Sequence, residues 1–587
     1  MIHDCMKGNT TINRRKFLER SVLGAGGVIF STVLIGSCTD HNIPEPNDPN
    51  QSGSFDYNVA SFDPTDSQII LWTRVSPANA SSQKVTLTYD IAMDTGFAQI
   101  IKTEMLDASM EDDFTISVDI SGLKSNTRYY YRFSITNTNV VSPTGETKTL
   151  AKAGEMDEVK LAVCSCSNYP AGLFNVYGAI AASEADVVLH LGDYIYEYGA
   201  GQYGSNPDTI SLARLHKPAN EILSLDDYRT RFKQYRSDPQ LQLAHQKKPF
   251  ICVWDDHEVA NDAFKDGAQN HNQNEGSFQE RKQRAIKAYH EYIGVRTLVD
   301  EKIYRSFSFG NIMDLHMLDT RIIGRDKQLS YADYFTQTGL DAAAFQKDWL
   351  NPNRTILGKE QLNWLGSAIG SGKGAWQVLG QQVLMGKMYV PAELLLAIVQ
   401  IVGEVDATGS ASPATFKMFQ TLLVELTQLK ARLLANDPTL TAQDKARIQT
   451  VLPYNLDAWD GYPVEREMVY AMAKGKKLIA LAGDSHNGWY SHLNANDKSQ
   501  AGRELAAPSV TSPGFEEYLG ADPASLGGFE QALALLVDDL QYLDASRRGY
   551  VMAKFSTSKI VSEWRYVASI TAPTVATTVG HSETITG

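Results

Sequence analysis

From about residue 155 onward, short apolar runs alternate with longer amphipathic stretches. Short apolar runs bounded by Gly and Asp are typical of buried strands in a parallel or mixed sheet. In open α/β sheets, ligands bind beyond the carboxyl ends of the strands, so we expect polar residues at these ends to gather along one edge. Four runs end abruptly in residues that bind hard metal ions: 161–163 before Cys164–Asn168, 187–191 before Gly192–Asp193, 250–254 before Asp255–Glu258, and 478–482 before Gly483–Asn487.

The same stretch contains further predicted elements. Runs 313–318 and 376–380 indicate two more strands, and 171–183 indicates a crossover helix. Residues 389–452 are predicted to be a helical insertion, because seven apolar residues recur there at three- and four-residue steps and form one stripe. They are Phe416, Phe419, Leu422, Leu423, Leu426, Leu429 and Leu433. Residues 394–402 are apolar but too short to span a bilayer. We expect a buried helix there, with a lid over the active site or a membrane contact as alternatives.

Residues 55–150 have a different pattern, which is all β. Apolar and polar residues alternate at period two in four segments, as in half-buried strands. They are 68–74, 84–90, 114–120 and 128–133. Residues 123–127, just before Tyr129 and Tyr131, resemble the tyrosine corner of fibronectin type III sandwiches. We therefore expect an accessory β-sandwich that packs against a catalytic unit at 155–567, with substrate recognition as its alternative role. Residues 568–587 are expected to be a C-terminal tail.

The first residues are predicted to be an export signal. Residues 13–18 (Asn-Arg-Arg-Lys-Phe-Leu) contain a twin-arginine core, and the apolar segment 21–35 follows. It leads into a lipobox-like Ile-Gly-Ser before Cys38. A membrane anchor helix is the alternative, but the segment is shorter than the ~20 residues that a span needs. We expect a signal peptide at 1–37, lipidation at Cys38, and a polar, proline-rich linker at 38–54. The protein would then be a periplasmic or cell-surface lipoprotein, bound to the membrane only through its lipid.

Composition narrows the classes of function. The 587 residues are 43% hydrophobic and 21% charged, as in ordinary globular proteins. The formal net charge of −14 argues against a nucleic-acid partner, which needs a basic surface. It does not exclude a phosphate substrate, because bound cations can reverse the local field. Five cysteines are too few for a disulfide framework. We also expect the protein to be a monomer.

The residue types after the four runs suit two different metal ions. Asp193 can reach two ions at once, and the Tyr196 phenol lies three residues further on. A phenolate, a thiolate and carboxylates suit a trivalent ion such as Fe(III), on which a thiol such as that of Cys166 is deprotonated. Asp256 and Asp484 add oxygen ligands, which suit Ca²⁺, Mg²⁺ or Mn²⁺.

Histidines complete the candidate chemistry. His486 could reach the first metal, and His257 is better placed near a substrate. Each feature has a structural alternative: an Asp at a strand end is often a helix cap, and Tyr196 could pack as an ordinary aromatic. His190 and His316 lie inside predicted strands, where we expect hydrogen-bonded core histidines.

Several segments together resemble a known family. They are Cys166–Asn168, Gly192–Tyr198, Trp254–Asn261, Leu318–Arg321, Gly380–Met385, Trp459–Pro463 and Gly483–His486. This set is similar to that of the PhoD-type alkaline phosphatase/phosphodiesterases, which are calcineurin-like metallophosphoesterases. Segments 61–65 and 70–74 resemble the β domain of that family.

The resemblance implies a four-layer αββα catalytic domain with one Fe(III) and one or two Ca²⁺ ions, Mn²⁺ or Mg²⁺ being possible in place of calcium. Cys166, Asp193, Tyr196 and His486 would bind iron, and Asp193 would share calcium with two further carboxylates. These are Asp256 and Asp484, and Asn261 is an additional ligand candidate. The usual Asp-x-His opening of metallophosphoesterases is absent, and Cys166 takes its place. The insertion 389–452 and segment 507–512 depart from the family pattern.

The expected reaction is hydrolysis of a small phosphomonoester or phosphodiester. A metal-bound water would lose its proton and attack phosphorus in line. Arg321 would help to neutralise the phosphoryl oxygens, and His257 would protonate the leaving group. Two rival functions stay open: a purple-acid-type phosphatase, which should show more histidine ligands, and a lipid-anchored binding protein with a decayed metal site.

Overall fold

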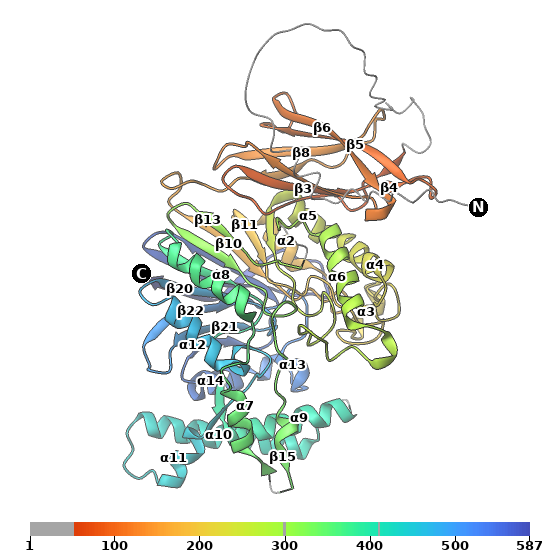
Figure 1. Ribbon diagram of the computed structural model, residues 1–587. Coiled ribbons are helices and arrows are strands. Elements are labelled where there is room, and N and C mark those ends of the chain that lie inside the picture. Colours follow the sequence, from red (N-terminus) through yellow and green to blue (C-terminus); the bar gives the residue numbers. More distant parts are fainter. Residues whose placement is uncertain (1–51, 298–300, 338, 409–410) are drawn as a thin grey trace, which may run out of the picture. The chain divides into compact units, whose positions relative to one another are not determined.

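The computed structural model describes residues 52–297, 301–337, 339–408 and 411–587. Here the chain forms two large mixed sheets with helices around them and a smaller N-terminal β layer (Figure 1). The predicted signal 1–37, Cys38 and most of the linker 38–54 lie outside the described residues. Within the described ranges, no helix has the length and apolar character needed to cross a bilayer.

The first sheet carries three of the four loops that are predicted to bind metal. Its order is β26-β25-β24-β10-β11-β12-β2-β3-β7, and β10, β11 and β12 run parallel at its centre. Both β11 and β12 are buried along their whole length, which explains why their sequences show no alternation. Part of the expected C-terminal tail forms the edge strand β26. The bounds are β26 Thr577–Thr586, β25 Lys559–Val567, β24 Gly549–Phe555, β10 Val159–Cys164, β11 Val187–His190, β12 Pro249–Cys252, β2 Val59–Phe62, β3 Gln68–Arg74 and β7 Thr115–Ser121.

The second sheet carries the fourth loop, which follows β20. Its order is β13-β14-β17-β20-β22-β21-β23, with β14, β17, β20 and β22 parallel. Side chains of β20 alternate between two cores: Ile479 and Leu481 share one with Leu161 of the first sheet, while Leu478 and Ala480 face the other side. The bounds are β13 Arg305–Phe309, β14 Met313–Met317, β17 Trp376–Gly380, β20 Lys477–Ala482, β22 Gln500–Ala506, β21 Gly488–Asn494 and β23 Leu540–Asp544.

Helices cover the outer faces of the sheets, which gives the αββα arrangement that the family resemblance implies. α2, α4, α5 and α6 lie on the side of the first sheet, and α8 and α12 on the side of the second (Figure 1). Local signals start these helices: α4 begins with a capping box of Ser224 and Asp227, and α5 with Asp238 followed by Pro239. The bounds are α2 Asn175–Ala182, α4 Leu225–Arg236, α5 Pro239–Lys247, α6 Phe278–Tyr292, α8 Gly358–Ser371 and α12 Pro463–Met472.

The N-terminal β domain shares a sheet with the catalytic part. β2 pairs in parallel with β12, with Phe62 opposite Phe250, so β2, β3 and β7 extend the first sheet. A four-stranded sheet packs on them through a core that includes Leu71, Leu87 and Phe133. Its order is β6-β5-β8-β9, with bounds β6 Ile100–Ser109, β5 Lys84–Ala92, β8 Arg128–Ile135 and β9 Gly145–Lys148. The accessory β layer is therefore continuous with the catalytic sheet.

The strands predicted at 68–74, 84–90, 114–120 and 128–133 are confirmed as β3, β5, β7 and β8. The resemblance to a tyrosine corner also has a structural basis, since the Lys124 N–H donates to the Tyr129 hydroxyl oxygen at 2.8 Å. β6 is absent from the sequence prediction because it is an edge strand, with most side chains exposed or half-buried. It therefore has no inward face to produce a period-two pattern.

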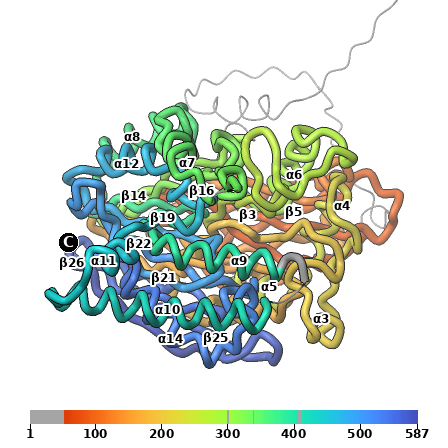
Figure 2. Tube along the Cα trace, turned by 90° about the horizontal axis from the view of Figure 1, so that it is seen from below, coloured from red at the N-terminus to blue at the C-terminus, as the bar shows by residue number. Residues whose placement is uncertain are grey.

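The helical insertion lies between two short paired strands, β18 (Tyr389–Pro391) and β19 (Val451–Pro453). It contains α9 (Ala392–Thr408), α10 (Pro413–Leu434) and α11 (Ala442–Gln449), and Figure 2 shows α9 and α10 side by side. Phe419, Leu423 and Leu426 of the predicted stripe are buried. In α9 only one face is buried: Leu394 is fully covered, whereas Leu396 is 44% exposed.

Candidate metal centre

The loops that follow β10, β11, β12 and β20 meet between the two sheets. The expectation of a single sheet edge is wrong, because three of the strand ends belong to the first sheet and one to the second. β20 pairs with β17 and β22 instead of joining β10–β12. The site therefore lies between both sheets. Five of its predicted ligands are buried, namely Cys166, Asp193, Tyr196, Asp256 and His486, whereas Asp484 and Asn261 are half-buried.

Four of the predicted ligands have a left-handed backbone. The φ angles are 63° at Cys166, 54° at Asp193, 59° at Asp484 and 62° at His486. Residues other than glycine rarely adopt this conformation, and such strain collects at functional sites where the surroundings impose it. Gly192 before Asp193 has φ 108°, and a Cβ there would lie 2.4 Å from that of Asp255. The turn into Asp193 thus requires glycine.

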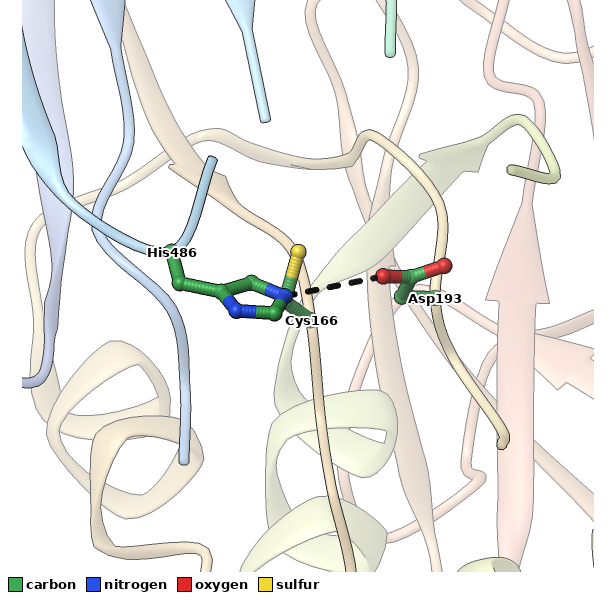
Figure 3. Close-up of side chains that lie close together, drawn as sticks. All are labelled: Cys166, Asp193 and His486. Carbon is green, nitrogen blue, oxygen red and sulfur yellow. Dashed lines mark ion pairs between the residues drawn. The ribbon is translucent and has the colours of Figure 1, made fainter. Parts of the chain in front are cut away.

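One group of donors combines four ligand chemistries. A thiol, a carboxylate and an imidazole, those of Cys166, Asp193 and His486, have donor atoms within 4.8 Å of one another. Figure 3 shows these side chains, with the 4.0 Å Asp193–His486 ion pair dashed. The Tyr196 hydroxyl donates to Asp193 Oδ2 (2.9 Å) and lies 3.3 Å from His486 Nε2. The structure therefore brings together all four residues predicted to bind the first metal.

Two further groups of donors share Asp256 with each other, and one of them also shares Asp193 with the first group. Donor atoms of Asp193, Asp256 and His257 lie within 4.8 Å of one another, as do those of Asp255, Asp256 and Asp484. Among the described residues, Asp193 Oδ1, Asp255 Oδ2 and Asp256 Oδ1 are buried without a hydrogen-bond partner. Leaving a buried carboxylate oxygen unsatisfied is costly, and hard cations prefer such oxygens as ligands. These residues consequently fit one or more bound cations.

Arg321 brings a positive charge into this cluster. It is fully buried; its Nη2 lies 2.7 Å from Asp484 Oδ1, its Nη1 2.7 Å from Asp457 Oδ2, and its Nε bonds to Asp255. Asp256 Oδ1 is 3.7 Å from Nη2. Burial raises the pKa of Asp484 to about 7, against the lowering effect of Arg321. Arg321 thus neutralises carboxylates here, and its contact with a phosphoryl group stays a prediction.

His257 belongs to one of these donor groups, with Asp193 and Asp256, and is held by Glu197. Its Nδ1 is 2.7 Å from Glu197 Oε2, and its ring centroid is 4.2 Å from that of Tyr196. Burial disfavours protonation of His257, but the negative charges of Asp256, Asp193 and Glu197 outweigh this effect and raise its pKa well above the usual value. The structure therefore favours a protonated imidazole at this position.

Several residues that organise the site are absent from the sequence prediction. The Glu258 carboxylate accepts N–H bonds from Asp193 (3.1 Å), Tyr194 (2.5 Å) and Asp255 (2.6 Å), and so joins two ligand loops. Ser512 Oγ lies 2.6 Å from the Tyr196 hydroxyl. Glu258 stands in the Asp-Asp-His-Glu segment, but nothing local in the sequence shows that it turns inward to bind backbone amides.

Asn261 is placed at the margin of the cluster. Its backbone N–H donates to Glu197 Oε1 (2.7 Å), and its side-chain amide donates to Gln269 Oε1 (3.0 Å). Its predicted role as a metal ligand stays a prediction. The two core histidines behave as expected: His190 lies 2.8 Å from the Tyr177 hydroxyl, and His316 bonds to Ser306 and Gln377.

Two facing sheets with this donor cluster at their strand ends are the arrangement expected of a metal-dependent hydrolase. The family models of known proteins agree: "PhoD-like phosphatase" matches residues 161–564, and "PhoD-like phosphatase, N-terminal domain" matches residues 41–151. The chain belongs to the PhoD-like phosphatase family.

Individual relatives extend this similarity over nearly the whole chain. Alkaline phosphatase D of Bacillus subtilis (strain 168) is 31% identical over 591 aligned positions, covering 97% of this chain and 86% of that protein. The solved structure of PhoD has a TM-score of 0.70 and 28% identity, and the match covers 91% of both chains. A purple acid phosphatase from yellow lupin seeds is also matched, with a TM-score of 0.48 and 11% identity over 90% of this chain and 74% of that one.

Arg321→Met should destabilise the metal-free protein by about 3–5 kcal/mol, because it leaves Asp255, Asp256 and Asp484 without their shared counter-charge. The free energy of unfolding in urea measures this loss. Arg284→Met is the matched control, since Arg284 pairs with Glu280 at the surface and should contribute little. Equal losses in the two variants would contradict the assigned role of Arg321.

Proposed function

We propose that the protein hydrolyses small phosphate esters at a centre of one Fe(III) and one or two Ca²⁺ ions. The observation that supports this most directly is the set of unpartnered carboxylate oxygens of Asp193 and Asp256 beside a buried thiol and phenol. Water does not reach these oxygens, and protein donors do not satisfy them. Bound cations would do so, and would leave Asp193 between the two metal positions.

Iron is the proposed occupant of the position among Cys166, Asp193, Tyr196 and His486. Burial, together with the charge of Asp193, raises the pKa of both the Cys166 thiol and the Tyr196 phenol well above their usual values. Neither group would lose its proton here without a strongly Lewis-acidic ion. A trivalent metal meets that requirement, and thiolate, phenolate and imidazole ligands suit iron.

Calcium is the proposed occupant of the position among Asp193, Asp256 and Asp484, with Asn261 as an additional ligand. The set consists of oxygen donors, which suit hard divalent cations. The same oxygen ligands would also bind Mn²⁺ or Mg²⁺. Arg321 would keep Asp484 and Asp256 close together before the ion binds, because it contacts both carboxylates.

The bound cations would lower the pKa of water and stabilise charge on the phosphoryl oxygens. The chain itself would provide the acid. Glu197 holds His257 through Nδ1, so Nε2 is the nitrogen that would donate a proton to the leaving oxygen. Arg321 would add to the positive field around the phosphoryl group.

Tyr196→Phe should remove the visible charge-transfer colour that an iron–phenolate pair produces. Absorption is measured per mole of bound iron, so that partial loss of metal does not mimic the effect. Tyr198→Phe is the control, because the Tyr198 ring lies 5.6 Å from that of His257 but Tyr198 belongs to none of the donor groups. Unchanged colour per iron in Tyr196→Phe would exclude the phenolate ligand.

His257→Ala should lower turnover by about 10²–10⁴-fold without loss of bound metal. The loss should be greater for an alkyl phosphate than for p-nitrophenyl phosphate, because p-nitrophenolate leaves without protonation. Metal content is measured beside the rates. Loss of iron from the variant, or equal losses for both leaving groups, would refute the acid role.

The same assays test the function itself. The metal-loaded wild type should hydrolyse p-nitrophenyl phosphate, bis-p-nitrophenyl phosphate or both, and the ratio of the two rates gives its preference between monoesters and diesters. The relative named alkaline phosphatase D supports activity on such esters. A protein that binds metal but hydrolyses neither ester would instead be a binding protein whose metal site has lost its catalytic activity.

We further propose export by the twin-arginine pathway, lipidation at Cys38 and a monomeric protein in the periplasm or at the cell surface. The motif at 13–18 and the lipobox-like residues before Cys38 support this. Mass spectrometry of the membrane-extracted protein should find an acylated N-terminal Cys38, and Cys38→Ser should release the protein from membranes. A wild-type protein without acyl chains would contradict the anchor.

A further inference from the structure

Arg231 is a fully buried arginine of α4 that binds backbone carbonyls. Its Nη1 donates to the Tyr196 carbonyl oxygen, and its Nη2 donates to those of Tyr198 at 2.9 Å and Pro218 at 3.3 Å. Its Nε donates to the Lys217 carbonyl oxygen at 3.0 Å. Bonds from a charged donor are stronger than those between neutral groups. Arg231 therefore ties two separate loops to α4.

The carbonyls on either side of Glu197 belong to a tripeptide whose first two side chains serve different parts of the site. The Tyr196 hydroxyl donates to Asp193 Oδ2 at 2.9 Å, and Glu197 Oε2 binds His257 Nδ1 at 2.7 Å. The middle carbonyl, that of Glu197, accepts the Ile222 N–H at 3.0 Å. All three carbonyls of the tripeptide are thus held, which fixes the backbone from which both side chains project.

We propose that Arg231 is a positioning residue, which holds the proposed iron ligand Tyr196 and the proposed acid His257 in place through this one stretch of backbone. This inference rests on the proposed function. A guanidinium is planar and presents its donors in a rigid fork, so the two carbonyls that flank Glu197 cannot move independently. Arg231 would act only through the Tyr196 phenol and the Glu197 carboxylate, because its own nitrogens bind the backbone.

Arg466 provides a matched comparison. It is also fully buried, but it pairs with Asp460 at 2.5 Å and donates to the Met385 carbonyl at 3.3 Å and the Tyr389 hydroxyl at 2.8 Å. These partners lie outside the donor groups and outside the tripeptide 196–198. Loss of Arg466 should therefore destabilise the fold by removing a buried charge, as loss of Arg231 would, without displacing the tripeptide.

The first test uses the full chain without metal. In Arg231→Met the backbone amides of segment 194–199 should exchange with solvent about tenfold faster than in the wild type, because the loop loses bonds to a charged donor. In Arg466→Met the same amides should keep the wild-type rate. Hydrogen exchange followed by mass spectrometry measures both. Equal exchange of this segment in the two variants would overturn the proposal.

The second test uses the iron-loaded protein. Arg231→Met should bind iron about 10–100-fold more weakly. Its absorption maximum, recorded per mole of bound iron, should shift because the phenolate no longer keeps its position. Turnover should fall more for an alkyl phosphate than for p-nitrophenyl phosphate, because a displaced Glu197 no longer holds the acid His257. A merely structural role would lower both rates equally and leave the absorption maximum unchanged, and that result would also overturn the proposal.

Arg231→Lys keeps the tests decisive if Arg231→Met does not fold, with Arg466→Lys as its control. Lysine retains the buried charge but lacks the fork, so the shift in absorption and the greater loss for alkyl phosphates should both persist. Wild-type behaviour of Arg231→Lys in both measurements would refute the positioning role. A wild type without an iron–phenolate band or without hydrolysis would refute the proposed function, and this inference with it. A wild type with both, beside Arg231 variants that match the Arg466 variants, would refute this inference alone.

Discussion

The ion cluster around Arg321 is the interaction on which the arrangement of the catalytic domain depends. Arg321 follows β14 of the second sheet and contacts Asp255, which follows β12 of the first, and Asp484, which follows β20. Buried carboxylates so close together repel one another unless positive charge lies between them. Arg321 supplies part of that charge, and the unpartnered oxygens of Asp193 and Asp256 call for the rest. The same group of buried charges therefore holds the two sheets together and forms the candidate metal site.

The local part of this arrangement could be predicted from the sequence. Continuous apolar runs identify buried strands, and the ligand types of Cys166, Asp193, Tyr196 and His486 indicate a candidate metal site. Each of these signals is contained in a short stretch of sequence. Sheet membership is not local: β20 joins the second sheet through hydrogen bonds to β17 and β22. The Arg321–Asp457 pair joins residues 136 positions apart, and no pattern near either residue indicates it.

The protein itself holds the predicted metal ligands in place before any ion binds. Cys166 and Tyr196 have no solvent exposure, and Glu258 fixes the backbone of both the Asp193 and Asp255 loops. A rigid, buried ligand set reduces the reorganisation that metal binding requires, while it slows exchange with solvent. That property agrees with the proposed export of an already folded protein, whose metals would be retained during transport.

The pairing of β2 with β12 has a consequence for how separable the two parts of this chain are. The two family-model regions, 41–151 and 161–564, look like separable modules along the sequence, yet they share a continuous sheet. A catalytic fragment without β2 would expose the open edge of β12, a row of unpaired backbone groups that invites pairing with other chains. Loss of the N-terminal region alone would leave that edge unpaired unless another strand replaced β2, so the two regions depend on each other structurally.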